Sequence, residues 1–173
     1  MPTDIRKPLD PVFSTNITRI LLNWGMIDNF AGLVLAEMCG LGNSEDATDL
    51  IHIVPLERKL KLIYSRRDKH PNIPKLLFTE VNWINEKSRP LRNLIVHGIL
   101  HLDFETDEPL GFISLSKDFQ EILIEDVPLV ATHSAYAHKV VSSLFKILKN
   151  IPVDVSELGI QQRPKELPLK AKM

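Results

Sequence analysis

One short stretch of the chain brings together three side chains suited to acid–base chemistry. Arg92, Asn93 and His97 occupy positions 92–97, and Gly98 follows. An imidazole exchanges protons near neutral pH, and a guanidinium stabilises negative charge on a phosphate. If the stretch is helical, Asn93 and His97 are four residues apart and share one face. Arg92 lies about 140° round the helix from His97, but its long side chain can reach the imidazole. The three residues therefore form a candidate site for phosphoryl chemistry.

The preceding residues predict one long helix that carries this site in its last turn. Side chains that fit a buried face recur at steps of three and four: Leu77, Val81, Ile84, Ser88, Leu91 and Ile95. This spacing indicates a helix over residues 73–98. The pattern continues across Pro90, so we predict a kink there rather than a break. Gly98 should end the helix, because glycine tolerates a positive φ.

An earlier helix is expected to begin at Ser14 or Thr15 and to end at Gly40 and Gly42. Asp28 projects from the middle of its apolar stripe, where a carboxylate is costly without a partner. Either Asp28 holds a cation in the core, or the stripe meets another chain around a polar pocket. We hypothesise that Asp28 contacts Arg92 and fixes its direction.

Two more helices are expected between these. Residues 43–54 form a short one, and Pro55 begins another whose core stripe contains Leu56, Leu60 and Ile63. The opposite side of the second helix is basic: Arg58, Lys59, Lys61, Arg66, Arg67 and Lys69. Such a face attracts a phosphate backbone, although a solvated helix face has the same composition.

The pattern of the chain changes after Gly98. Leu100, Leu102 and Phe104 alternate with polar residues, which predicts a strand. A second strand over 112–115 and a short third at 122–124 complete a small antiparallel hairpin or flap within about residues 99–125. The last long helix should run from Asp126 or Pro128 to about Lys149.

These elements predict a mainly all-α fold: a four- or five-helix bundle with a β-hairpin inserted before the last long helix. Residues 14–150 form the domain. Residues 1–13 are expected to be an irregular arm, and the Pro-rich residues 151–173 a mobile tail.

Composition sets broader limits. The chain has 173 residues, 44% of them hydrophobic and 25% charged, which suits one globular domain. The net charge of −1 gives no overall attraction to nucleic acid. The single Cys39 excludes an internal disulfide framework. Without an apolar leader or a membrane-length apolar run, we predict a cytoplasmic protein with no membrane contact.

The motif resembles that of the HEPN superfamily (higher eukaryotes and prokaryotes nucleotide-binding). Arg92, Asn93, three apolar residues, His97 and Gly98 match the family pattern of Arg, a polar residue, three residues and His. The chain looks most similar to small stand-alone bacterial HEPN-like proteins in which His-Gly precedes strands. One subgroup, the nucleotidylated toxins, has Tyr two residues after the His. This chain has Ile99 there, which argues against that subgroup.

The resemblance implies a homodimer and a metal-independent endoribonuclease that needs no cofactor. In such an enzyme, Arg92, His97 and Asn93 would be catalytic. Beside them, Asp28 would be a positioning residue through Arg92, and the basic helix would draw in the RNA strand. It equally implies the alternative of a non-catalytic interaction or RNA-binding module, and a regulatory protein partner would fit either function.

Structural roles remain open for the same residues. His97 could cap the helix C-terminus, Arg92 could be an ion-pair residue with Asp28 as its partner, and His133 fits a hydrogen-bonded core histidine. A metal-dependent hydrolase using His97 and His101 is a distant third, since Gly98 and the strand pattern place these two histidines on different elements. We therefore assign no metal ligand.

Overall fold

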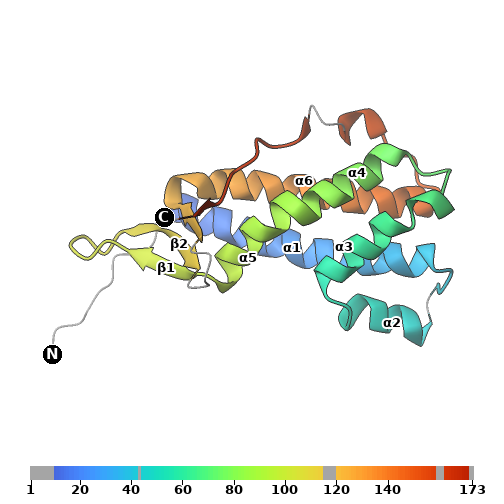
Figure 1. Cartoon of the computed structure of the whole chain (residues 1–173), viewed down its shortest axis with the longest axis horizontal. Coiled ribbons are helices and arrows are strands. Elements are labelled where there is room, and N and C mark those ends of the chain that lie inside the picture. Colours follow the sequence, from blue (N-terminus) through green and yellow to red (C-terminus); the bar gives the residue numbers. More distant parts are fainter. Residues whose placement is uncertain (1–9, 43, 115–119, 159–161, 172–173) are drawn as a thin grey trace.

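The computed structural model describes residues 10–42, 44–114, 120–158 and 162–171. Three long helical segments run along the molecule and share its core (Figure 1). Helix α1 (Pro11–Met38) packs along α6 (Val127–Leu148), and the third segment comprises α4 (Lys75–Trp83), a π-helical turn (Ile84–Ser88) and α5 (Arg89–His97). The fold is therefore mainly helical and bundle-like, as predicted.

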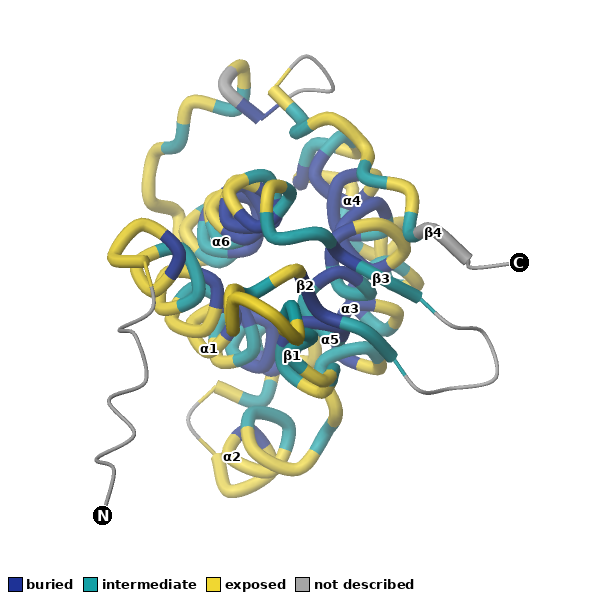
Figure 2. The backbone as a smooth tube through the Cα atoms, turned by 90° about the vertical axis from the view of Figure 1, so that its left-hand side faces the viewer, coloured by how far each residue is buried: buried dark blue, intermediate teal, exposed yellow. Residues whose placement is uncertain are grey.

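Two shorter helices pack at the end of the bundle far from the sheet (Figure 1). Helix α2 (Glu45–His52) is capped by the Ser44 hydroxyl, and α3 (Leu56–Ser65) contacts α1 and α4. Both were expected. Seen along the bundle, the buried parts of the helices face inward (Figure 2). Short 3₁₀ turns cover Arg67–Lys69, Ile124–Asp126 and Val155–Leu158.

The long helix continues across Pro90, as the periodicity predicted, and the distortion is a π-helical turn just before it. Pro90 has no N–H, and its ring would crowd the carbonyl of Glu86 in a regular helix. The Arg89 N–H bonds to the Ile84 carbonyl, five residues back, which widens the helix at this point. The helix then resumes and delivers residues 92–97 to the sheet end.

Gly98 ends the helix as predicted, but not because of a positive φ. Gly98 has φ −75° and ψ 167°, which any residue can adopt. Instead, a Cβ there would lie 2.1 Å from the Leu94 carbonyl oxygen and 3.0 Å from that of Ile113. Glycine is required because the chain passes from α5 to β1 in close contact with the main chain of Leu94 and Ile113, which leaves no space for a side chain.

Helix α1 begins earlier than predicted. The Asp10 carboxylate, rather than Ser14 or Thr15, caps it by accepting the N–H groups of Val12 and Phe13 at 3.3 and 3.1 Å. Residues 11–13 of the expected arm are therefore helical, and residues 1–9 lie outside the described residues. At the other end, Gly40 and Gly42 have φ of +69° and +57°, which confirms them as the terminating residues.

The β insertion forms an antiparallel sheet in the order β1 (Ile99–Leu102), β2 (Pro109–Ser114), β3 (Gln120–Leu123) and β4 (Lys170–Ala171). The first strand ends before Phe104, which is 98% exposed in a turn, so its predicted extension is wrong. Phe112 pairs with Ile122 across the sheet, and both are buried against the bundle.

The C-terminal segment differs from the expected mobile tail. Leu158 is buried, and the described residues that follow run back along α4 and α6 to the sheet (Figure 1). The His133 ring bonds to the Lys165 carbonyl through Nε2, and Lys170 and Ala171 pair with β3. The packed domain thus extends well beyond residue 150. Among the described residues, no helix is both long and apolar enough to cross a membrane.

Candidate functional site

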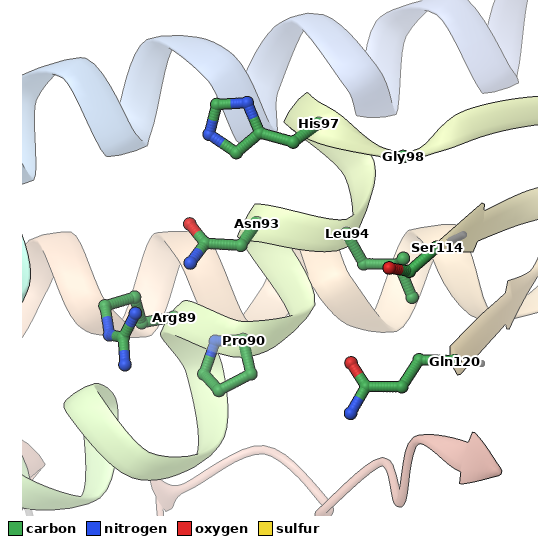
Figure 3. Close-up of a pocket in the computed structure, with 8 residues that line it drawn as sticks. All are labelled: Arg89, Pro90, Asn93, Leu94, His97, Gly98, Ser114 and Gln120. Carbon is green, nitrogen blue, oxygen red and sulfur yellow. The ribbon is translucent and has the colours of Figure 1, made fainter. Parts of the chain in front are cut away.

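The last turns of α5 bring the three motif side chains together as predicted. Nη1 of Arg92 donates to the Asn93 amide oxygen at 3.0 Å and lies 3.5 Å from Nε2 of His97. The second distance is at the limit of a hydrogen bond, so it is a loose contact. Asn93 and His97 lie on successive turns of the same helix face (Figure 3). His97 itself is exposed at the end of α5.

A pocket of about 290 Å³ opens beside Asn93 and His97. Its lining residues come from α5, the Gly98 junction before β1 and the ends of β2 and β3: Arg89, Pro90, Asn93, Leu94, His97, Gly98, Ser114 and Gln120. Figure 3 shows Ser114 and Gln120 reaching towards α5 from the strands. The pocket therefore combines a titratable group with amide, hydroxyl and apolar side chains.

Arg92 is held in a partly desolvated position. Burial lowers the pKa of its guanidinium, the charge of Asp28 raises it, and Arg89 lowers it. A guanidinium nevertheless keeps its charge at any physiological pH. Its Nε is buried with no hydrogen-bond partner among the described residues. Arg92 is thus a fixed cation whose hydrogen-bonding capacity is only partly used.

The predicted partner of Asp28 is wrong. The Asp28 carboxylate binds Nζ of Lys59 at 2.6 Å. Arg92 donates its hydrogen bond to Asn93, and the charge of Asp28 acts on Arg92 only by raising the pKa of its guanidinium. Lys59 Nζ also donates to the main-chain carbonyls of Asp28 and Ile51, at 3.2 and 2.6 Å. Lys59 is fully buried, so it does not belong to the basic face on which we placed it.

The rest of the basic face is real but partly neutralised. Arg58, Lys61, Arg67 and Lys69 are exposed and Arg66 is half-buried. Lys61 pairs with Glu57 at 2.6 Å, and Arg67 approaches Asp68 at 3.8 Å and covers the Tyr64 ring. Among these side chains, Lys61 connects to the pocket through Glu57, which also pairs with the pocket residue Arg89 at 3.2 Å.

Metal binding is the third possibility for the histidines. No group of three or more potential metal ligands occurs among the described residues. His133 is buried, with Nδ1 3.0 Å from the Ser88 hydroxyl and Nε2 2.9 Å from the Lys165 carbonyl. Burial lowers its pKa, and the Lys165 carbonyl and Glu166 partly oppose that effect. His133 is the hydrogen-bonded core residue that its position suggested.

Sequence reasoning missed three pocket residues. Arg89 repeats at four-residue intervals with Asn93 and His97, so helical spacing could have included it. Ser114 and Gln120 carry no such signal, because only the strand pairing Ser114–Gln120 brings them opposite α5.

The Lys59 site makes a first prediction. Lys59→Met should lower the free energy of unfolding by about 1–3 kcal/mol, because it removes the buried ammonium that donates to the Asp28 carboxylate and to the partly buried carbonyls of Asp28 and Ile51. Asp28→Asn should cost less, since the Asp28 side chain is 46% exposed and water can replace the lost partner. Urea unfolding of both variants measures the difference. A larger loss in Asp28→Asn would mean that Asp28 has a second buried partner.

Comparison with known proteins adds no assignment to this geometry: no protein-family model matches the chain, and no curated protein or solved structure matches it. The case for a function therefore depends on the residues around the α5 terminus.

Proposed function

We propose that the protein is a metal-independent endoribonuclease of HEPN type, acting at the end of α5. The observation that carries the proposal is the loose 3.5 Å approach of Arg92 Nη1 to His97 Nε2 at the mouth of an open pocket. A base and a fixed cation this close to each other can contact the same phosphate group when it binds beside them. Catalytic contacts that are long in the free enzyme commonly tighten when substrate binds.

The chemistry needs only these side chains. His97 takes the proton from a ribose 2′-hydroxyl, whose oxygen attacks the adjacent phosphorus. Arg92 stabilises the charge that builds on the phosphoryl oxygens. The bond to the 5′-oxygen breaks, and an acid must protonate that oxygen. The products are a 2′,3′-cyclic phosphate and a 5′-hydroxyl end.

The acid is the reason to propose a homodimer. One chain supplies a single His97, so a symmetry-related His97 would protonate the leaving group in a composite cleft. Exposed apolar side chains near the motif support an interface with a second copy of the chain. Leu21, Leu22 and Met26 of α1 are exposed, as is Ile99 immediately after His97-Gly98, and α1 packs against α5. Sedimentation at micromolar concentration should give twice the 19.7 kDa chain mass; a monomer would remove the composite site.

A structural role for the motif accounts for less of this geometry. A purely structural Arg92 would be expected to satisfy its buried donors, whereas its Nε has no partner among the described residues. The exposed His97 likewise packs into no core. The basic residues Arg58, Lys61, Arg66 and Arg67 would add long-range attraction for the RNA strand.

The reaction itself is the test. Purified protein should cut single-stranded RNA in the presence of EDTA and leave the matching DNA intact, because DNA lacks the attacking hydroxyl. Mass spectrometry of the fragments should find 2′,3′-cyclic phosphate ends. Binding of RNA without cleavage would instead favour the non-catalytic module, and cleavage that EDTA abolishes would favour a metal-dependent hydrolase.

A further inference from the structure

The pocket beside His97 has features that the cleavage chemistry does not use. The reaction requires Arg92 and His97, yet the cavity extends away from Arg92, past Pro90 and Leu94, to the ends of β2 and β3. We propose that this pocket holds the base of the nucleotide whose 2′-hydroxyl is attacked, and that the Gln120 amide selects adenine there. The inference depends on the proposed function for the reaction, but it also predicts base-selective binding without cleavage.

The size and lining of the pocket fit one flat nucleobase. Its volume of about 290 Å³ is at the low end of small-molecule sites, which span roughly 300–1,000 Å³. Pro90, Leu94 and Gly98 offer apolar surface to a ring face, while amides and a hydroxyl stand at the edges. This distribution is that of a base-binding site, in which a ring packs on apolar groups and its edge is hydrogen-bonded.

Gln120 is placed to read the edge of that ring. Its backbone is fixed on both sides, pairing with Ser114 in β2 and with Ala171 in β4. Its side chain points from β3 towards Pro90 and Leu94 (Figure 3). No hydrogen bond of its side-chain amide to another described residue is recorded, so both the donor and the acceptor of that amide are available to a ligand.

The available groups match adenine better than guanine. An amide pairs with adenine through two bonds, accepting from N6 and donating to N7, whereas guanine is best matched by a guanidinium. The guanidinium at this pocket belongs to Arg89, whose Nε donates to Asn85 at 3.0 Å and whose Nη1 pairs with Glu57 at 3.2 Å. The oxygen of the second amide, Asn93, is already taken by Arg92. Gln120 therefore provides the free two-bond partner.

His97 links this base to the cleaved bond. It lines the pocket and also approaches Arg92, so it stands between the base and the phosphate. The 2′-hydroxyl that His97 deprotonates lies on the sugar that carries the base on the 5′ side of the scissile phosphate. Adenosine should therefore be the nucleotide immediately before the cut.

The test uses four DNA oligonucleotides, each with a single ribonucleotide: A, C, G or U. The substrate with ribo-A should have the highest kcat/KM, by about 10-fold, a value within the discrimination of one two-bond pair. Gln120→Ala should remove the preference. Gln120→Glu should favour cytosine instead, because a carboxylate only accepts and cytosine offers its N4 donor. The control is Glu121→Ala, which alters the neighbouring residue on the opposite face of β3.

Binding separates this inference from the proposed function. Fluorescence anisotropy with labelled oligo-dT carrying one central dA, dC or dG cannot be affected by cleavage. Tighter binding of the dA probe, lost in Gln120→Ala, would support the pocket even if no RNA were cut. Equal kcat/KM for the four ribonucleotides in an active enzyme would overturn the inference and leave the nuclease standing. Equal binding of the three probes by an inactive protein would overturn both.

Discussion

RNA cleavage should fall by about 10²–10⁴-fold in His97→Ala, the usual contribution of one general acid–base group. The cleavage rate of Arg92→Ala should be about 10²–10³-fold below that of the wild type, because the variant loses a charge that stabilises the phosphoryl oxygens in the transition state. Arg92→Lys should recover little, since an ammonium cannot reproduce the planar fork of a guanidinium. Initial rates on a fluorophore–quencher RNA measure all three.

Matched variants separate lost chemistry from lost fold. His52→Ala removes an exposed histidine from α2, and Arg19→Ala removes an exposed arginine from α1. Neither residue lies at the pocket beside His97, so both variants should cleave at the wild-type rate. The far-ultraviolet circular dichroism and sedimentation of His97→Ala and Arg92→Ala should also match the wild type. If His97→Ala and Arg92→Ala both cleaved RNA at the wild-type rate, the active site would lie elsewhere in the chain.

Mixing the two inactive variants tests the composite cleft. A mixed dimer keeps one Arg92 and one His97, from different chains, in the same cleft. Partial recovery of cleavage after the two proteins exchange subunits would therefore support a shared site. No recovery, with subunit exchange demonstrated, would mean that one Arg92 and one His97 on different chains are not enough for cleavage.

The parts of the site that the sequence predicted are those governed by helical periodicity. Asn93 and His97 could be placed together because they lie on one helix, and the helix could be recognised because its apolar spacing continues across Pro90. The form of the distortion, a π turn over Ile84–Ser88, could not be predicted, because several backbone adjustments accommodate a proline equally well.

Lys59 shows where such reasoning fails. It follows Arg58 on a basic helix, so its composition resembles a solvated face. It is buried because its ammonium meets Asp28 of α1 and the Ile51 carbonyl at the end of α2. Those partners come together only in the folded bundle, and the sequence offers no spacing that connects them.

The C-terminal segment was misjudged for a related reason. Its prolines and charges resemble those of a mobile tail, because they bury little apolar surface by themselves. The signal that was available lay in α4: Glu80 interrupts the apolar face between Leu77 and Ile84, as Asp28 does in α1. A buried carboxylate predicts a cationic partner, but not that the partner is Arg163.

Arg163→Met should be among the most destabilising single changes in the chain, with a loss of about 3–5 kcal/mol in the free energy of unfolding. Arg163 grips Glu80 through two bonds, Nε to Oε2 at 2.6 Å and Nη2 to Oε1 at 2.7 Å. The Glu80 side chain is 0% exposed. Its remaining donor is the Tyr136 hydroxyl at 2.9 Å. The variant therefore strands a carboxylate in the core, and urea unfolding measures the cost.

The buried charge, rather than the lost contact, should be the cause, and a double variant tells them apart. Glu80→Gln alone should cost less, because the Arg163 side chain is 18% exposed and keeps contact with water, whereas that of Glu80 is 0% exposed. Adding Glu80→Gln to Arg163→Met should restore part of the lost stability, since a neutral amide still accepts from Tyr136 and leaves no charge unpaired. Lys165→Ala serves as the control, because the Lys165 side chain is exposed and the bond to His133 uses the main-chain carbonyl, which the substitution keeps. Its free energy of unfolding should stay within about 0.5 kcal/mol of the wild-type value. If Arg163→Met were equally mild, the C-terminal segment would not be packed on α4 in solution.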